Sequence, residues 1–403
     1  MTDALERRLL DLFPAERIGR WRTAERDLPL VSPDSEEGWR ECLRLAHAGG
    51  HRIHPVGAGT KLSWCPPPPG TELVLSSAAW EGVVAYEPGD GTLTARSGST
   101  MDGLAKTVAG GGHLLSPDVA LASRATLGGV IGAGQSGFDR LLHGSIRDAL
   151  LGTRVLLADG RSSKSGGRLV KNVTGYDLHR LWCGSRGSLC VVLEASLRLY
   201  PAPRERRMLA AEAETIEQAF ALAAHLWREG RDIRPAAVCV HDEGRGREPG
   251  VLLALQGRAE VVASEEASIR RLLPRIRVST IEGEEQWKRL RDRPALLPSL
   301  EIQTLPMGTG LAVARAREAA APFVVTAHPL VGTASLSFEE EVDLREQAQG
   351  IAALAPPGTR VLLRGASSGG PLGTDVPPAA RALMERLKLG YDPTGVFAGG
   401  VPA

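Results

Sequence analysis

In the first half of the chain, apolar and polar residues alternate over short stretches. In each stretch the spacing of the apolar residues indicates either a helix or a strand. The opening run MTDALERRLLDLF sets charged residues between apolar ones, which predicts an amphipathic helix and not a cleaved leader peptide. Apolar residues at positions 39, 42, 43 and 46 follow helical spacing, and Gly49-Gly50 ends that helix. Beyond it the apolar runs shorten and glycine interrupts them, which favours strands joined by tight turns.

Several short elements are expected in this first half. We expect a helix at 101–109 and strands at 52–56, 73–75, 83–86, 93–96, 155–158 and 189–199. Asp159-Gly160 directly follows a strand and predicts a hairpin turn. The segment 65–70 contains four prolines, which predicts a rigid surface loop.

After Pro203 the pattern changes to longer helical stretches rich in Glu, Arg and Ala. Helices are expected at about 214–229, 260–273, 338–354 and 377–388, with strands between them at 251–255, 323–327, 334–338 and 360–363. This alternation indicates an α+β domain with helices on one face of a sheet. We therefore place a domain boundary near Arg204.

Composition narrows the class of protein. The chain has 403 residues, 43% of them apolar and 24% charged, with a net charge of +1. That length suggests two or three domains. The near-zero net charge does not indicate a surface that binds nucleic acid or an anionic membrane. Aromatic residues make up only 4%, which argues against a base-stacking platform. No apolar run approaches the roughly 18 residues of a membrane span. We expect a cytoplasmic protein, with any membrane contact made through partners.

The five cysteines are scattered along the chain and form no C-x-x-C pair: Cys42, Cys65, Cys183, Cys190 and Cys239. This spacing argues against a disulfide framework, a zinc site or an iron–sulfur cluster, and predicts reduced thiols.

Glycine is concentrated in two segments. The run A-T-L-G-G-V-I-G-A-G-Q-S-G at 125–137 holds five glycines in thirteen residues. A backbone so free of side chains lets successive N–H groups converge on an anion. Gly57-Ala58-Gly59-Thr60 has the same character and follows a predicted strand. Two such loops fit a diphosphate that is held from two sides.

Two other interpretations of these glycines remain open. Gly132-x-Gly134-x-x-Gly137 matches the Rossmann dinucleotide fingerprint, and Asp159 lies about twenty residues further on. A Rossmann unit needs a clean strand before the first glycine and an unbroken helix after the last. Here Gly128-Gly129 precedes the motif and His143-Gly144-Ser145 breaks the segment after it, which disfavours that unit. The glycines could also be turn residues without a ligand, but their density disfavours this.

A family resemblance appears between 143 and 189. The runs H-G-S-I-R-D, L-G-T-R-V and A-D-G, then K-N-V-T-G-Y-D-L-H-R-L-W-C-G-S, resemble FAD-binding domains of the vanillyl-alcohol-oxidase or PCMH type. Within that superfamily they are most similar to the small FAD-binding subunits of bacterial glycolate oxidases. The resemblance covers about 30–204 and returns at D-P-T-G-V-F, 392–397. Ala398-Gly399-Gly400 stands where the family usually has Asn-Pro-Gly.

The resemblance implies an α+β fold with a helical segment at 1–29 and a two-lobed PCMH-type FAD-binding domain at 30–204. It further implies an α+β cap at 205–383 and a tail at 384–403 that returns to the FAD domain. The implied cofactor is noncovalent FAD. Three segments would contact the cofactor. A first loop would lie at its diphosphate, a second loop beside the diphosphate and the dimethylbenzene end of the flavin, and a strand at the pyrimidine end of the flavin. These positions are Val56, Gly57, Ala58, Gly59 and Thr60; Thr126, Gly128, Gly129, Gly132, Gly134, Ser136 and Gly137; and Gly187, Leu189 and Val192.

Other positions in the resemblance have less specific roles. Asp148 and Asp177 are expected to be structural acids that fix loop backbone. Lys171 and Tyr176 would either line the flavin or simply pack.

No catalytic residue follows from the sequence. His328 is a candidate base. Alternatively, it is a histidine at a strand end whose hydrogen bonds are all made within the protein. His47, His51 and His54 cluster in sequence without the spacing of a metal site. The arginines near Trp287 indicate a solvated helix face, or alternatively a contact to a substrate carboxylate or a partner. They are Arg289, Arg291 and Arg293.

Three functions are compatible with these features. The first is the FAD-binding subunit of a glycolate-oxidase-like complex, beside a catalytic flavoprotein and an iron–sulfur subunit. The second is a stand-alone FAD-linked dehydrogenase of a 2-hydroxy acid. The third is a flavin-fold structural partner without turnover. Catalytic relatives carry paired metal-binding histidines, which we do not find, and this favours the first over the second. The intact glycine loops disfavour the third.

Overall fold

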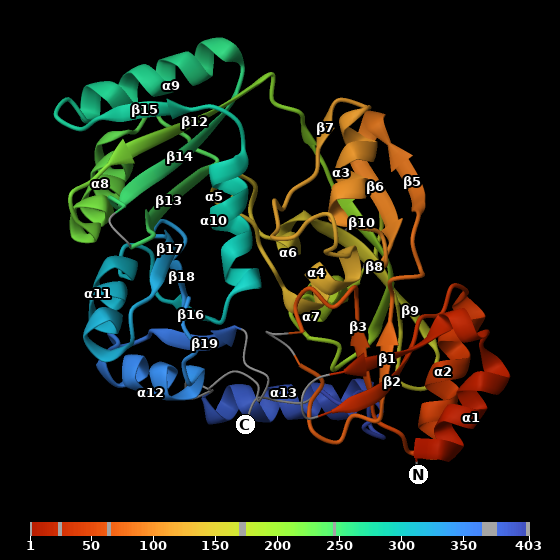
Figure 1. Ribbon diagram of the computed structural model, residues 1–403. Coiled ribbons are helices and arrows are strands. Elements are labelled where there is room, and N and C mark those ends of the chain that lie inside the picture. Colours follow the sequence, from red (N-terminus) through yellow and green to blue (C-terminus); the bar gives the residue numbers. More distant parts are fainter. Residues whose placement is uncertain are drawn as a thin grey trace.

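The two halves of the chain form two layered bodies, which lie opposite one another (Figure 1). This computed structural model describes residues 2–22, 26–62, 66–168, 175–244, 247–364 and 377–399. No helix in these ranges is long and apolar enough to cross a membrane.

The first body begins with a four-stranded sheet packed against two helices. Its strands run in the order β1 (Ile18–Arg22), β2 (Asp27–Val31), β4 (Leu73–Ser76) and β3 (Ile53–Val56), preceded by α1 (Thr2–Leu12) and crossed by α2 (Glu36–Gly49). Ser35 starts α2 because its Oγ accepts the N–H of Gly38 at 3.2 Å. Trp39, Cys42 and Leu43 on the buried face of α2 pack in one core with the strands.

A five-stranded antiparallel sheet completes the first body. Its order is β5 (Val83–Glu87), β6 (Thr92–Arg96), β10 (Val191–Arg198), β8 (Leu150–Leu156) and β9 (Ser162–Gly166). Its helices are α3 (Met101–Ala109), α4 (Leu127–Ala133), α5 (Arg140–His143), α6 (Ile146–Ala149) and α7 (Leu178–Trp182), with a small sheet of β7 (His113–Leu114) and β11 (Tyr200–Pro201). Asp159-Gly160 turns between β8 and β9 as predicted, although β8 begins and ends earlier than the expected 155–158.

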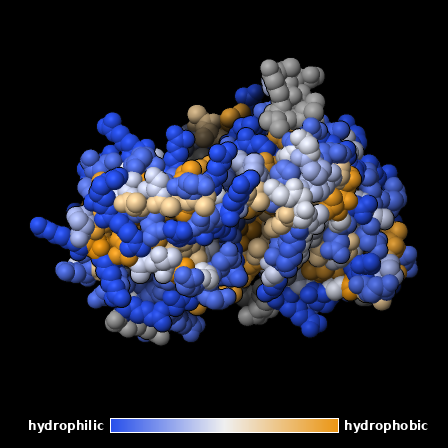
Figure 2. Space-filling model, turned by 90° about the horizontal axis from the view of Figure 1, so that it is seen from above, coloured by the Kyte–Doolittle hydropathy of each residue, from blue (hydrophilic) through white to orange (hydrophobic). Residues whose placement is uncertain are grey.

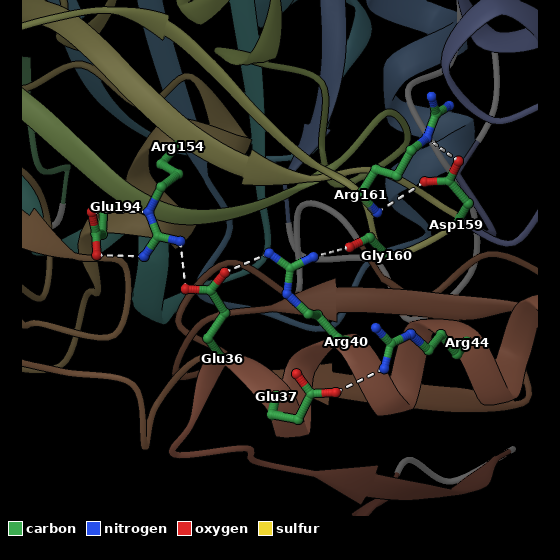
Figure 3. Close-up of polar contacts among 9 residues, drawn as sticks. All are labelled: Glu36, Glu37, Arg40, Arg44, Arg154, Asp159, Gly160, Arg161 and Glu194. Atoms are coloured by element: carbon green, nitrogen blue, oxygen red, sulfur yellow. Dashed lines mark hydrogen bonds and ion pairs between the residues drawn. The ribbon is translucent and has the colours of Figure 1, made fainter.

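A network of ion pairs fastens α2 to this second sheet (Figure 3). Arg154 of β8 donates to Glu36 of α2 at 2.5 Å and to Glu194 of β10 at 2.6 Å. Arg40 of α2 reaches the carbonyl of Gly160 at 2.5 Å. Because α2 also packs on the four-stranded sheet, these contacts hold the two sheets in one arrangement.

The expectation of an open glycine loop at 125–137 is wrong for its central part. Leu127–Ala133 is a helix, because Thr126 caps it and Leu127, Val130 and Ile131 form a buried stripe at helical spacing. Gly134, at φ 62, ends the helix. The G-x-G-x-x-G motif therefore starts at the C-terminal end of a helix, beside an antiparallel sheet, which excludes the Rossmann arrangement.

The second body is built on an eight-stranded antiparallel sheet. Its order is β15 (Val278–Ile281), β12 (Glu205–Glu212), β14 (Gly250–Gly257), β13 (Ala237–Asp242), β17 (Val324–His328), β18 (Thr333–Ser337), β16 (Ser299–Gln303) and β19 (Arg360–Arg364). One face carries α8 (Ile216–Glu229), α9 (Ala259–Leu272), α11 (Thr309–Ala319) and α12 (Leu344–Leu354), which share its main core. The helices on this face agree with the predicted α+β arrangement.

One helix of the second body departs from that expectation. α10 (Glu285–Leu296) lies on the other face of the sheet, toward the first body, where Trp287 and Leu290 pack with Phe138 (Figure 1). α12 begins at Leu344 and not near 338, because Asp343 accepts the N–H groups of its first turn. Finally, α13 (Pro378–Tyr391) leaves the second body and runs back along the first (Figure 1). The exact division of the chain near residue 204 stays a prediction.

Candidate cofactor site

A first cavity lies inside the first body, between the end of β3, α4 and the start of β10. It encloses about 740 Å³, including the part open to solvent. The predicted cofactor positions that line it are Val56, Gly57, Ala58, Gly59, Thr60, Thr126, Gly128, Gly129, Gly132, Gly187 and Val192. Sequence reasoning missed several of its other wall residues, among them Trp39, His54 and Arg186. Trp39 and His54 carry no local signal, because only the packing of α2 and β3 brings them to the cavity.

The loop after β3 has the properties of an anion site. Within the described residues, the N–H groups of Gly57, Ala58, Gly59 and Thr60 have no hydrogen-bond acceptor. Gly59 has φ 79, which favours glycine. A Cβ on Gly57 would lie 2.0 Å from Oγ1 of Thr126, so this position requires glycine. Free N–H groups around such a narrow cradle fit the diphosphate of a dinucleotide.

The α4 glycines contribute differently from what the sequence predicts. The N–H of Gly128 donates to the carbonyl of Ser97 at 2.8 Å, and that of Gly129 to Oγ1 of Thr126 at 3.3 Å. These two groups are therefore already used within the protein and are not part of an anion nest. Gly132 has no atom within 4 Å of its Cβ position. The bare surface of α4 thus allows close approach, while the loop after β3 offers the donors.

A second, larger cavity lies between the two bodies. It encloses about 3700 Å³, including open solvent, and Gly134, Ser136, Gly137 and Leu189 line it rather than the first cavity. Figure 2 shows the surface hollowed between the two halves of the molecule. His54, Ala133, Ser185 and Arg186 line both cavities, so the two lie next to one another. An elongated ligand could therefore extend from the first cavity to the cap.

The walls of the second cavity are strongly cationic. Their arginines come from both bodies: Arg26, Arg140, Arg147, Arg186, Arg291, Arg345, Arg360 and Arg364. The described carboxylates in the lining, Asp118 and Glu301, are paired with Arg291 at 2.5 Å and Arg364 at 2.6 Å. A cleft with this balance concentrates anions.

Arg186 has an uncommon backbone at the junction of the two cavities. Its φ is 54, a left-handed conformation that L residues other than glycine rarely adopt. Its N–H donates to the carbonyl of Gly132 at 2.8 Å, which holds this conformation. Backbone strain of this kind gathers at functional sites.

His328 ends β17 and faces the second cavity. Its ring meets that of Phe138 edge-on, with centroids 4.3 Å apart. Burial lowers the pKa of His328 to about 4, so its imidazole is neutral, and a weak base, at neutral pH. Phe138 directly follows the glycine motif, so this contact brings the cap histidine to the flavin domain.

The expectation of a solvated face for the three α10 arginines is wrong for two of them. The side chain of Arg291 is 13% exposed and pairs with Asp118, while that of Arg293 is 12% exposed and pairs with Glu243 at 3.1 Å. Trp287 also donates to Asp118, at 2.8 Å. Arg289 is 41% exposed and also pairs with Glu243. α10 is thus the helix that joins the cap to the flavin domain.

The remaining candidates lie apart from one another. His47 contacts Thr394 and His51 contacts Glu72, so they face different segments. Among the described residues no group of three His, Cys, Asp or Glu is placed to hold a metal. Tyr176 is 90% exposed and does not pack. Lys171 and Cys65 lie outside the described residues. Asp148 accepts the N–H and Oγ of Ser145, which confirms its structural role.

Comparison with known proteins agrees with this geometry. Residues 28–165 match the model of the FAD binding domain family. The chain is 36% identical over 137 residues to glycolate oxidase subunit GlcE of Escherichia coli (strain K12), which is 34% of this chain and 39% of that protein. It is 35% identical over 192 residues to glycolate oxidase subunit GlcD of Bacillus subtilis (strain 168), covering 47% and 40%.

One further relative in sequence and one solved structure extend the comparison. D-lactate dehydrogenase of Archaeoglobus fulgidus is 31% identical over 223 residues, covering 53% of this chain and 49% of that protein. The match thus spans less than half the length of each of these three relatives. A solved alkyldihydroxyacetonephosphate synthase aligns with a TM-score of 0.73 at 15% identity, over 98% of this chain and 85% of that one.

The fold and the cavity define a flavoprotein with a PCMH-type FAD-binding domain, and FAD is its cofactor. Its FAD-binding part is glycolate-oxidase-like in sequence. The predicted fold class and FAD as the cofactor are both confirmed, whereas its noncovalent attachment and the individual FAD contacts stay predictions.

Proposed function

We propose that this chain is an FAD-dependent oxidoreductase of 2-hydroxy acids and acts as the FAD-binding subunit of a glycolate-oxidase-like complex. The observation that carries the proposal is the cavity between the two bodies. It combines a cationic wall with a neutral, half-buried histidine and lies next to the FAD cavity. A 2-hydroxy acid needs these features, namely cations for its carboxylate and a base for its hydroxyl proton.

Different residues would bind the cofactor, orient the substrate and accept its proton. The N–H groups of 57–60 would hold the diphosphate, and the bare outer face of α4 would let the cofactor lie close. When bound, FAD supplies the hydride acceptor. Arginines of the second cavity would orient the substrate carboxylate. His328 would take the hydroxyl proton at its imidazole, and α10 with Phe138 would keep the cap closed against water.

The proposed partners are a catalytic flavoprotein and an iron–sulfur subunit. Support comes from the similarity to two proteins, from different organisms, that are named as glycolate oxidase subunits. In addition, the described cysteines all carry free thiols at separate sites: Cys42, Cys183, Cys190 and Cys239. We therefore assign an iron–sulfur relay to another subunit. We also propose a cytoplasmic location, with any membrane contact made through these partners.

A stand-alone 2-hydroxy acid dehydrogenase is the second candidate, because one chain already contains the FAD cavity, His328 and the cationic wall. Anaerobic stopped-flow separates the two. The FAD-loaded chain alone is expected to be reduced slowly by glycolate or D-lactate, and faster once partner subunits are added. Reduction of the lone chain at ordinary enzyme rates of about 1–10³ per second would support the stand-alone enzyme. No reduction under either condition would favour a structural partner without turnover.

A further inference from the structure

The C-terminal segment of the chain returns to the edge of the four-stranded sheet. Ile53 of β3 donates its N–H to the carbonyl of Val396 at 2.7 Å, and Ala398 donates to the carbonyl of Ile53 at 2.7 Å. Phe397 pairs with Ile53 in a parallel bridge, and its side chain is fully buried in the first core. The segment 392–399, here called the tail, therefore forms an isolated β-bridge beside β3.

One ammonium group connects this tail to two other segments of the chain. Nζ of Lys388, in α13, donates to the carbonyl of Ser188 at 2.8 Å, to the carbonyl of Phe397 at 2.8 Å and to Asp392 at 2.6 Å. Asp392 in turn accepts the N–H groups of Val396 at 2.9 Å and Phe397 at 2.8 Å. The side chain of Lys388 is 18% exposed and that of Asp392 is 0% exposed. Lys388 thus ties α13, the tail and the segment at Ser188 together.

The two segments that the tail contacts are both walls of the FAD cavity. β3 leads directly into Gly57, and Gly187, next to Ser188, packs on Pro55 of β3. A Cβ on Gly187 would come within 3.0 Å of that proline ring. Gly399 lies against Ser188 in the same way, because its Cβ position is 2.9 Å from Cβ of Ser188. Any displacement of the tail would therefore reach both walls.

We propose that Lys388 is a positioning residue for FAD, which locks the tail against β3 and Ser188 so that docking of the tail and binding of FAD are coupled. The contacts explain the coupling. When the tail is docked, the walls at Gly57 and Gly187 are held at their spacing. A ligand that spans those walls favours the docked tail by the same free energy. The inference rests on FAD binding and not on the proposed oxidation of a hydroxy acid.

The test compares the full-length protein after removal of flavin with its K388M, K388R and K106M variants. Lys106 is a matched control, because it lies in the same body with its side chain 76% exposed. FAD affinity is measured by titration of flavin fluorescence. K388M is expected to weaken FAD binding by about 5- to 150-fold, the usual range for coupled events. K388R should recover part of the loss, because a guanidinium can donate to the same carbonyls, and K106M should bind like the wild type.

Hydrogen exchange at the amides of Val396, Phe397 and Ala398 is the second readout. FAD should slow their exchange in the wild type and in K106M, but much less in K388M. Wild-type FAD affinity in a K388M variant whose tail amides exchange faster would overturn the proposal. So would an exchange rate of these amides that does not respond to FAD.

A second variant decides the matter if K388M does not fold. G399V keeps the ammonium and disturbs the approach of the tail to Ser188, at a position that also lines the second cavity. It should also weaken FAD binding and expose the tail amides, and unchanged affinity would count against the coupling. A wild-type chain that binds no FAD at all would instead refute the proposed function itself.

Discussion

Two glycines of α4 should respond in opposite ways to the same substitution. Gly132 has no atom within 4 Å of its Cβ position, whereas a Cβ on Gly128 would lie 2.7 Å from Cβ of Ser97 and 3.2 Å from its carbonyl oxygen. G132V therefore meets no steric conflict in the protein alone. Because valine is a better helix former than glycine, apo stability should stay level or rise by about 0.3 kcal/mol. G128V should lose about 1–3 kcal/mol of apo stability through overpacking.

For FAD affinity we expect the opposite order, with G132V more damaging than G128V. In G132V a branched side chain enters the first cavity, where the cofactor has to approach α4. Forcing a side chain into space that the ligand needs costs about 1–3 kcal/mol, as overpacking does, which corresponds to about 5- to 150-fold weaker binding. Thermal unfolding of the apo-protein and titration with FAD measure the two effects separately. Unchanged FAD affinity in a fully folded G132V variant would refute the placement of FAD along α4.

Three further predictions follow from other contacts. R154M, which removes the fork between Glu36 and Glu194, should lower the free energy of unfolding by about 1.5–3 kcal/mol. The exposed pair of Arg161 with Asp159 in Figure 3 is its control, since R161M should cost less than about 1 kcal/mol; equal losses would contradict the network. Burial lowers the pKa of His328 to about 4, so its contribution to stability is full above pH ~6.5 and is lost as pH falls toward 4. H328Q should flatten that part of a stability–pH curve, and an identical curve would argue against a neutral, buried ring. Acid precipitation of the purified protein should release FAD, whereas release of FMN would contradict the cofactor assignment.

Much of the local structure could be predicted from the sequence. The amphipathic periods of α2, α8 and α9, the hairpin at Asp159-Gly160 and the glycine-rich loop after β3 depend on residues close together in the chain. The FAD-binding class was also readable, because its motifs are contiguous. Strands such as β13 and β16 and helix α11 were missed, since their patterns are weak without their neighbours in the sheet.

The sequence by itself pointed to FAD through contiguous motifs that resemble a known family. Its glycine density predicted a diphosphate-binding loop and its apolar periodicity predicted two differently patterned halves, because all of these are local properties. Only the tertiary structure decided which glycine N–H groups are free, since Ser97 and Thr126 take those of Gly128 and Gly129. It also showed that Arg291, expected on a solvated helix face, makes a largely buried ion pair with Asp118. Likewise, only the fold brings Lys388 next to Ser188, which lies 200 residues away in the chain. Such partners are far apart in the chain, and hydrogen bonds and desolvation depend on distance in space.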